Sequence, residues 1–361
     1  MTSEERRLAR YERRKAKRNT YTQPTYDEVF TLTNLYKSYR LCVRGVGWKA
    51  SIQRFKLCAF SELCKLYYQL HNYKWKSKGF YEFNIIERGK KRHIRSVHIS
   101  ERVVQRTLCD NALVPIFRRY LIYDNSATLK GKGIKFSYDR LKVHLSSHIK
   151  EYEHNGYILR YDVHDYFGSL SHENLFERAN IIHDNSIKQL AFTLVNNFGD
   201  VGLGLGSQVS QINAVYYLTS MDNYIVHNLG IKRYARYMDD GYAICKNKEE
   251  ALLVKDTIIR YSKLLNFTMN EKKFTITKLD KGINWLKCFY WINNTGKILR
   301  KPCRDCVKRE HRKLKKFITI SKELVEVSYN SWKSWLQNCN ARHIIYCMHK
   351  YKDKLITPYL S

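Results

Sequence analysis

The chain of 361 residues carries 65 lysine and arginine residues against 33 aspartate and glutamate residues, a formal net charge of +32. This excess is far beyond what solubility requires, so an acidic polymer is the expected partner. No apolar run reaches the roughly 18 residues that a membrane span needs, and the N-terminus lacks the apolar stretch of a signal peptide, so we expect no membrane partner and a cytoplasmic location.

The chain begins with a basic arm that has almost no large apolar side chains. Such a composition predicts a segment that is disordered by itself and becomes helical on RNA. Pro24 ends the arm. Its cations are Arg6, Arg7, Arg10, Arg13, Arg14, Lys15, Lys17 and Arg18.

Helices and a hairpin are predicted next. Residues 30–72 have helical periodicity, and strands with polar alternation follow around residues 80–100. The run Gly89–Arg95 is typical of a hairpin turn that feeds a strand. From Glu101 to Tyr120 the pattern is again helical. Its apolar stripe consists of Val103, Val104, Leu108, Leu113 and Ile116.

A buried strand is predicted for Tyr157–Val163, which is apolar and rich in β-formers. Asp162 falls near the C-terminal end of this strand, where α/β sheets place reactive groups. Taken alone, Asp162 is better explained as a strand-end cap.

The tetrapeptide Tyr237–Asp240 places two adjacent carboxylates between short apolar or aromatic runs, which predicts a hairpin with an acidic tip. Two like charges close together are unfavourable unless a cation neutralises them. With Asp162 as a third carboxylate and the Val163 carbonyl as a neutral oxygen ligand, the set suits a pair of Mg²⁺ ions that drive phosphoryl transfer. The alternative for the pair by itself is a solvated Asp-Asp turn.

The C-terminal half is predicted to be largely helical, over Val209–His227, Lys248–Leu265 and Lys308–Tyr351. Trp332, Trp335 and Leu336 are candidate core residues of the last of these segments. The ten cysteines are expected to be reduced thiols. The spacing of five cysteine and histidine residues near the C-terminus is compatible with a zinc site, but buried or loop thiols are the preferred interpretation. Its ligands would be Cys303, Cys306, Cys339, His343 and Cys347.

Six motifs of the chain resemble those of reverse transcriptases of the bacterial retroelement type. They occur in the same order along the chain as in that family, over about residues 30–340. Tyr237–Asp240 resembles the catalytic Tyr-x-Asp-Asp box, and Asp162–Phe167 resembles the first palm motif. The other four are Arg95–Arg106 of the fingers, the glycine-rich Gly202–Gln211, Met269–Phe274 of the palm and Gly282–Cys288 of the primer grip.

The resemblance implies an α+β fold of the right-hand polymerase type, with fingers, a palm whose antiparallel sheet packs on helices, and a helical thumb. It implies five parts: a basic N-terminal arm (1–22), fingers with N-terminal helices (23–150), the palm (151–280), the primer-grip region (281–302) and the thumb (303–361).

The resemblance also assigns catalytic roles. Asp162, Asp239 and Asp240 correspond to the catalytic, metal-binding carboxylates, with Asp240 in a supporting position and Val163 as a carbonyl ligand. The implied cofactor is a pair of Mg²⁺ ions, for which Mn²⁺ can substitute. Phe167, five residues after Asp162, stands where the family places an aromatic gate against ribose. The alternative is a core phenylalanine packed under the strand.

Substrate contacts follow in the same way. Arg92 or Arg95 would hold the β- and γ-phosphates, and Lys273, with Lys272 as its competitor, would protonate the leaving group. Gly206 would lie near the templating pair, and Leu205 stands where many relatives have glutamine. An apolar residue there either relaxes fidelity or is neutral. The primer would be contacted by Tyr237, Met238, Trp285 and Leu286.

The implied function is RNA-directed DNA polymerisation, which adds dNTPs to a primer 3′ end on a dedicated, structured non-coding RNA in bacterial antiphage defence. The expected partners are the RNA template, the DNA product or primer, and dNTPs. An accessory protein or a second copy of the chain is a further candidate partner. The first alternative is an error-prone diversity-generating enzyme, which Gly204 and the pair Lys287-Cys288 make less fitting. The second is a non-catalytic RNA-binding scaffold with a polymerase fold.

Overall fold

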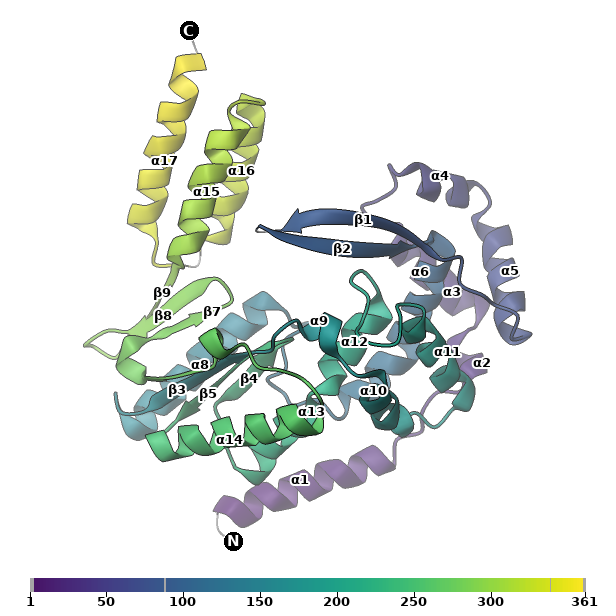
Figure 1. The fold of residues 1–361 in the computed structure, drawn as a ribbon, viewed down its shortest axis with the longest axis horizontal. Coiled ribbons are helices and arrows are strands. Elements are labelled where there is room, and N and C mark those ends of the chain that lie inside the picture. The colour runs from purple at the N-terminus through teal and green to yellow at the C-terminus, as the bar shows by residue number, and fades with distance from the viewer. Residues whose placement is uncertain (1–2, 88, 338, 360–361) are drawn as a thin grey trace. The chain divides into compact units, whose positions relative to one another are not determined.

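The computed structural model describes residues 3–87, 89–337 and 339–359 of the chain (Figure 1). The chain forms two compact units, each assembled from separate segments. The five-part division inferred from the sequence remains a prediction. The first unit comprises Met1–Ser137, Arg160–Tyr242 and Leu253–Thr275, and the second comprises Tyr138–Leu159, Ala243–Leu252 and Ile276–Ser361.

The basic arm differs from its prediction, because it forms the helix α1 (Ser3–Asn19) instead of a disordered segment. Alanine, arginine, lysine and glutamate are strong helix formers, which is the local reason for a helix here. Tyr11 also packs against His227, with ring centroids 4.8 Å apart, so a tertiary contact holds the helix. Met1 and Thr2 of the predicted arm lie outside the described residues.

The helices predicted over residues 30–72 are confirmed. The first of them begins at a capping side chain, as helix N-termini favour: the Thr31 hydroxyl accepts a hydrogen bond from the Asn34 amide. In the preceding short helix, Thr25 and Glu28 form a reciprocal capping box. The elements are α2 (Tyr26–Val29), α3 (Leu32–Cys42), α4 (Ala50–Leu57) and α5 (Ala59–His71).

The predicted hairpin is also present. Strands β1 (Phe80–Glu87) and β2 (Lys90–Val97) pair antiparallel, with Phe80 opposite Val97. The helix predicted after them is confirmed, with a π-helical segment in its middle. It consists of α6 (Ile99–Leu108), η1 (Cys109–Leu113) and α7 (Val114–Arg118).

The single helix predicted over residues 209–227 is three consecutive helical segments. The break falls at Leu218, in a stretch rich in aromatic and β-branched residues, which lose rotamer freedom in a helix. The segments are α12 (Gln208–Tyr217), α13 (Thr219–Asn223) and η3 (Tyr224–Asn228). They follow α9 (Tyr166–Ser169), α10 (His172–Arg178), η2 (Ala179–Ile181) and α11 (Asn185–Asn196).

The central sheet contains the two acidic motifs and has the strand order β4-β5-β3-β6. Because β4 and β5 are hydrogen-bonded neighbours joined by only two residues, they form an antiparallel hairpin, as predicted. The strand predicted for 157–163 is confirmed as β3. The strands are β3 (Tyr157–Asp162), β4 (Tyr234–Tyr237), β5 (Asp240–Cys245) and β6 (Thr275–Lys278).

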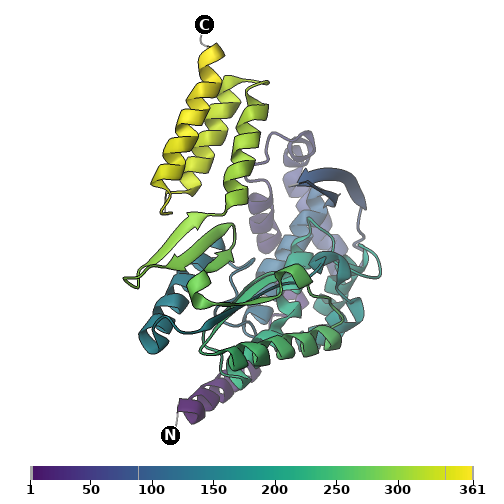
Figure 2. The same cartoon turned by 60° about the vertical axis from the view of Figure 1, so that its left-hand side comes forward.

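In the second unit a small antiparallel sheet precedes three helices that lie side by side in both views (Figures 1 and 2). The helices share a core that includes Leu314, Val325 and Leu336, none of which is exposed. Trp332 is buried too, whereas Trp335 packs at the margin of this core. The elements are β7 (Ile283–Trp285), β8 (Cys288–Ile292), β9 (Ile298–Pro302), α15 (Arg304–Phe317), α16 (Lys322–Trp335) and α17 (Arg342–Ile356).

Two further long helices complete the secondary structure. The helix predicted at Lys248–Leu265 is confirmed as α14 (Lys248–Leu264), and α8 (Ile134–Tyr152) precedes β3. Among the described residues, no helix combines the length and the apolar character needed to cross a membrane. The short helices are η4 (Glu271–Lys273), η5 (Leu279–Lys281) and η6 (Thr357–Tyr359).

Candidate active site

The candidate site lies where the end of β3 meets the turn between β4 and β5. The backbone amide of Val163 donates to the carbonyl oxygen of Asp239, at 3.1 Å. On its other side the carbonyl oxygen of Asp162 accepts from the Asn270 amide, at 2.9 Å. The structure therefore brings together the predicted residues Asp162, Val163, Asp239 and Asp240, although they come from separate parts of the chain.

Basic and amide side chains engage two of the three carboxylates. Asp162 is 6% exposed, and its two oxygens accept from Lys273 Nζ at 2.8 Å and from Asn270 Nδ2 at 3.0 Å. Asp240 Oδ1 lies 3.5 Å from Nη2 of Arg160. Each of these cations offsets part of the negative charge that the turn concentrates.

The pKa values of Asp239 and Asp240 are both raised. Burial raises the pKa of Asp239, and repulsion from Asp162 adds to the rise, while Lys273 and Arg92 oppose it. Burial also raises the pKa of Asp240 to about 6, against the attraction of Arg160. Buried, mutually repelling carboxylates of this kind occur where a charged ligand or a proton transfer is handled.

The donor set fits a hard divalent cation, because carboxylate and carbonyl oxygens are the ligands that Mg²⁺ prefers. In the described part of the chain, however, no three His, Cys, Asp or Glu side chains are arranged so that they could hold a metal ion. The ammonium group of Lys273 is bonded to an Asp162 oxygen. That group is 45% exposed on a flexible stem, so a cation can displace it by a side-chain movement.

Phe167 lies in α9 and is half-buried, next to the glycine-rich loop. Its carbonyl oxygen accepts from the Leu203 amide at 2.6 Å. A side chain at Gly202 would meet the carbonyl oxygens of Phe167 and Gly168 at 2.9 and 2.8 Å, and Gly202 has a φ of 82°. Glycine is therefore needed for this close approach. The role of Phe167 as a gate remains a prediction.

The rest of the glycine-rich loop lies against the hairpin strand β2. A side chain at Gly206 would meet the carbonyl oxygen of Arg95 at 3.3 Å, and a side chain at Gly204 would collide with the ring of Phe198. The packing on Phe198 explains why glycine occupies position 204. Leu205, between these two glycines, is half-buried.

The two candidate triphosphate-binding arginines have different surroundings. Arg95 pairs with Glu82, with Nε–Oε1 at 3.1 Å, and donates from Nη1 to the carbonyl oxygen of Phe198 at 2.6 Å. Arg92 lies close enough to Asp239 to lower the pKa of that carboxyl. Arg92 is therefore the better candidate for a ligand at the acidic turn, and Arg95 supports the loop.

The predicted primer-contact residues of the second unit lie at the turn between β7 and β8. Trp285 is fully buried, so its side chain supports the turn rather than presenting a surface. Leu286 and Lys287 both have positive φ values, of 44° and 73°, and the Tyr138 hydroxyl donates to the Leu286 carbonyl at 2.5 Å. The exposed part of this element is therefore the turn itself. Tyr237 and Met238 lie on the acidic hairpin of the first unit.

Among the described residues, the candidate zinc ligands form no group of three that could hold a metal ion. The Cys303 thiol lies 3.1 Å from Asn284 Oδ1, and the Cys306 thiol donates to the carbonyl oxygen of Lys287 at 3.6 Å. Cys347 instead pairs with His343, one turn away on α17, at 3.4 Å. The structure describes all ten cysteines, and none of them forms a disulfide bond.

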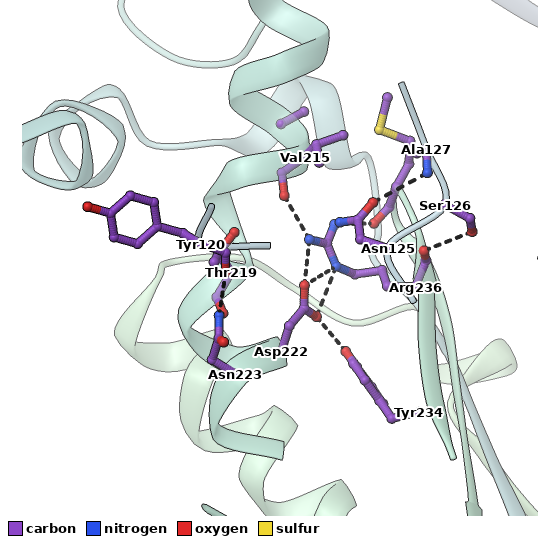
Figure 3. Close-up of polar contacts among 12 residues, drawn as sticks. Tyr120, Asn125, Ser126, Ala127, Val215, Thr219, Asp222, Asn223, Tyr234 and Arg236 are labelled. Carbon is purple, nitrogen blue, oxygen red and sulfur yellow. Dashed lines mark hydrogen bonds and ion pairs between the residues drawn. The ribbon is translucent and has the colours of Figure 1, made fainter. Parts of the chain in front are cut away.

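Sequence reasoning missed four residues that surround the acidic turn. Arg160 had a signal, because it lies two residues before Asp162 and so on the same face of the strand. Asn270 lies within the recognised motif Met269–Phe274, whereas Arg236 and Asp222 form a buried ion pair (Figure 3) that no local pattern reveals.

Comparison with known proteins gives matches among solved structures only. No protein-family model and no curated protein matches the chain. The apo telomerase of Candida tropicalis aligns at 15% identity, with a TM-score of 0.49, over 78% of this chain and 63% of that one. The same telomerase truncated from its C-terminal domain aligns at 15% identity with a TM-score of 0.47, over 62% of this chain and 55% of that one. A Candida albicans telomerase in complex with a TWJ fragment of telomeric RNA aligns at 10% identity with a TM-score of 0.47, over 78% of this chain and 59% of that one. The chain spans less than two thirds of each.

Proposed function

We propose that this chain is an RNA-directed DNA polymerase, a reverse transcriptase that adds dNTPs to a primer 3′ end. The observation that carries the proposal is the hydrogen bond between Val163 and Asp239. It joins two motifs whose order and composition resemble the catalytic motifs of that family. Burial and repulsion from neighbouring carboxylates raise the pKa values of Asp239 and Asp240, and a bound divalent cation would relieve that repulsion.

Asp162, Asp239 and the Val163 carbonyl would hold two Mg²⁺ ions, with Asp240 in support. These ions, or Mn²⁺ in their place, would stabilise the charge on the attacking and leaving oxygens. With a cation on Asp162, Lys273 would be released from this carboxylate and would donate a proton to the leaving group. Arg92 binds the β- and γ-phosphates from the hairpin β1-β2. Phe167 packs against the sugar and rejects a 2′-hydroxyl.

The proposed template is a dedicated, structured non-coding RNA. The formal net charge of +32 supports an extended phosphate contact whose affinity falls with salt. The helices of the second unit contribute to this charge, since α15 carries seven lysines and arginines in the sequence RDCVKREHRKLKKF. The other proposed partners are a DNA primer or product and dNTPs. An accessory protein or a second copy of the chain is a further candidate partner.

The proposed biological role is antiphage defence. Gly204 and the pair Lys287-Cys288 depart from the pattern of diversity-generating enzymes, which is the reason to prefer defence over templated mutagenesis. A defence island with a small RNA gene next to this gene would agree with the role. A variable target gene with a template repeat would contradict it.

Incorporation assays with the purified protein test the activity. The protein and its copurifying RNA are incubated with Mg²⁺ and one labelled nucleotide set at a time, and the products are sequenced. We expect deoxynucleotide incorporation that depends on Mg²⁺. A rate with ribonucleotides above that with deoxynucleotides would contradict both the DNA-polymerase assignment and the role of Phe167.

A second candidate, a non-catalytic RNA-binding scaffold, is favoured by one observation. Lys273 and Asn270 already engage both oxygens of Asp162, as in a site that has exchanged metal binding for a permanent ion pair. On this alternative, Asp239→Asn leaves the cellular function intact.

A further inference from the structure

The acidic turn rests on a fully buried ion pair between β4 and α13 (Figure 3). The side chains of Arg236 and Asp222 are both 0% exposed, and Nη2 of Arg236 lies 2.7 Å from Oδ2 of Asp222. A second nitrogen, Nε, donates to the same carboxylate at 2.9 and 3.0 Å. The Tyr234 hydroxyl donates to Oδ1 at 2.7 Å. The carboxylate is therefore saturated by donors.

The guanidinium also reaches the turn itself. Its Nη1 donates to the carbonyl oxygen of Met238 at 2.9 Å, and its Nη2 donates to the carbonyl oxygen of Val215 at 2.7 Å. Met238 has a φ of 55°, a left-handed conformation that is unfavourable for a residue with a side chain. With Asp239 bonded to Val163, two successive carbonyl groups of the turn are held. The arginine thus secures a strained peptide directly before the first acidic residue.

Such a pair is an expensive way to fill a core, since desolvation of two charges consumes much of their attraction. Burial disfavours the charged guanidinium, but the attraction of Asp222 outweighs it, so the pKa of Arg236 is raised. The backbone of Arg236 is fixed separately, because its amide donates to Asp124 and its carbonyl accepts from Ser126, at 3.3 and 3.1 Å. The backbone of β4 is therefore held by its own hydrogen bonds, and the Arg236 side chain is not needed to fix the strand.

We propose that Arg236 is a positioning residue, which Asp222 orients and which locks the Met238 peptide so that Asp239 and Asp240 face Asp162. The inference rests on the proposed function, because it concerns the site that would bind the divalent cation. Outer-shell groups that orient metal-binding residues are typically worth about 10–100-fold in metal affinity or activity.

Three variants separate positioning from stability. Arg236→Lys keeps the charge opposite Asp222, but one ammonium cannot also reach Met238 and Val215. Arg236→Gln leaves the carboxylate buried without its ion-pair partner, and we expect a large loss of stability. The double variant Arg236→Gln/Asp222→Asn removes both charges, keeps an acceptor for Tyr234 and is expected to regain most of that stability.

The readouts are the Tm, the affinity for Mn²⁺ by calorimetry, the affinity for RNA, and the kcat and KM for dNTP incorporation. For Arg236→Lys and the double variant we expect a Tm near that of the wild type and unchanged RNA affinity. Their Mn²⁺ affinity and kcat should both be lower by about 10–100-fold. The KM for dNTP should change little, because the turn and not the triphosphate contact is altered.

Two results would overturn the inference. One is a double variant that regains Mn²⁺ affinity together with its Tm. The other is a set of variants whose Mn²⁺ affinity falls only in proportion to Tm, including variants that fail to fold, since a purely structural pair produces that pattern. Failure of the proposed function is a separate outcome: the wild type and Asp239→Asn would then bind Mn²⁺ equally.

Discussion

The amide of Val163 donates to the carbonyl oxygen of Asp239, and this one backbone hydrogen bond joins the two acidic motifs of the chain. The contact places the end of β3 beside the turn of the hairpin β4-β5. It concentrates three carboxylates in a partly buried space, where Lys273 and Arg160 supply the positive charge.

Asp240 is expected to destabilise the metal-free protein above pH 6. Its pKa is raised from 3.8 to about 6 in the folded state, so the native protein holds this proton more tightly than the unfolded chain does. The stability contributed by the protonated form is lost as the pH rises through that window. Asp240→Asn should therefore be more stable than the wild type at pH 7.5, by about 1–3 kcal/mol. Below pH 4 the difference should largely vanish. Denaturant unfolding at the two pH values, without divalent cations, measures this, and an equal difference at both would contradict it.

Lys273 is expected to compete with the divalent cation for Asp162. Lys273→Met frees the oxygen to which Nζ is bonded at 2.8 Å, so the affinity for Mn²⁺ should rise several-fold. The kcat should fall, because the proposed proton donor is lost. Lys272→Met is the matched control, since it removes the neighbouring charge outside this ion pair. Calorimetric titration with Mn²⁺ provides the measurement. An affinity that falls in Lys273→Met would show that the lysine helps to build the site instead.

Substitutions of Arg92 and Arg95 are expected to have different effects, on substrate binding and on stability respectively. Arg92→Ala should raise the KM for dNTP by about tenfold or more, because a charge-assisted contact to phosphate is worth about 1.5–3 kcal/mol. Arg95→Ala should chiefly lower the Tm, because it removes the ion pair with Glu82 and the bond to Phe198. Steady-state kinetics and thermal unfolding of both variants test the division. The reverse assignment would follow if Arg95→Ala raised the KM at an unchanged Tm.

Gly202 is expected to tolerate no side chain. In Gly202→Ala the new methyl group meets two carbonyl oxygens below 3.0 Å, at a φ of 82°. We expect a loss of about 1–3 kcal/mol of stability and a shift of Phe167 that weakens sugar discrimination. Gly199→Ala is the control, because Gly199 also has a positive φ but its added methyl group meets nothing within 4 Å. If both variants lose the same stability, backbone strain explains the effect and the close approach does not.

Local patterns were sufficient to predict much of this structure. Alternation and turn residues predicted β3, the acidic hairpin and the hairpin β1-β2, because each depends on a few consecutive residues. The carboxylates that meet in the site were also predictable, since their motifs are contiguous. The helix of the basic arm was missed because composition alone does not reveal its contact between Tyr11 and His227.

What escaped prediction depends on contacts between distant segments. The pairing of Arg236 with Asp222 requires the packing of β4 on α13, and sequence spacing carries no signal for it. The choice between Arg92 and Arg95 depends on Glu82 across the hairpin. The break at Leu218 interrupts an apolar pattern that continues on both sides of it, so periodicity predicted one helix.

The most direct test of the central claim is Mg²⁺-dependent dNTP incorporation by Asp239→Asn, measured beside its affinity for the copurifying RNA. The substitution preserves shape and removes one carboxylate from the turn that Val163 joins to β3. We predict that incorporation falls to background while RNA affinity stays at the wild-type value. Incorporation at the wild-type rate in this variant would contradict the assignment of the acidic turn as the catalytic centre.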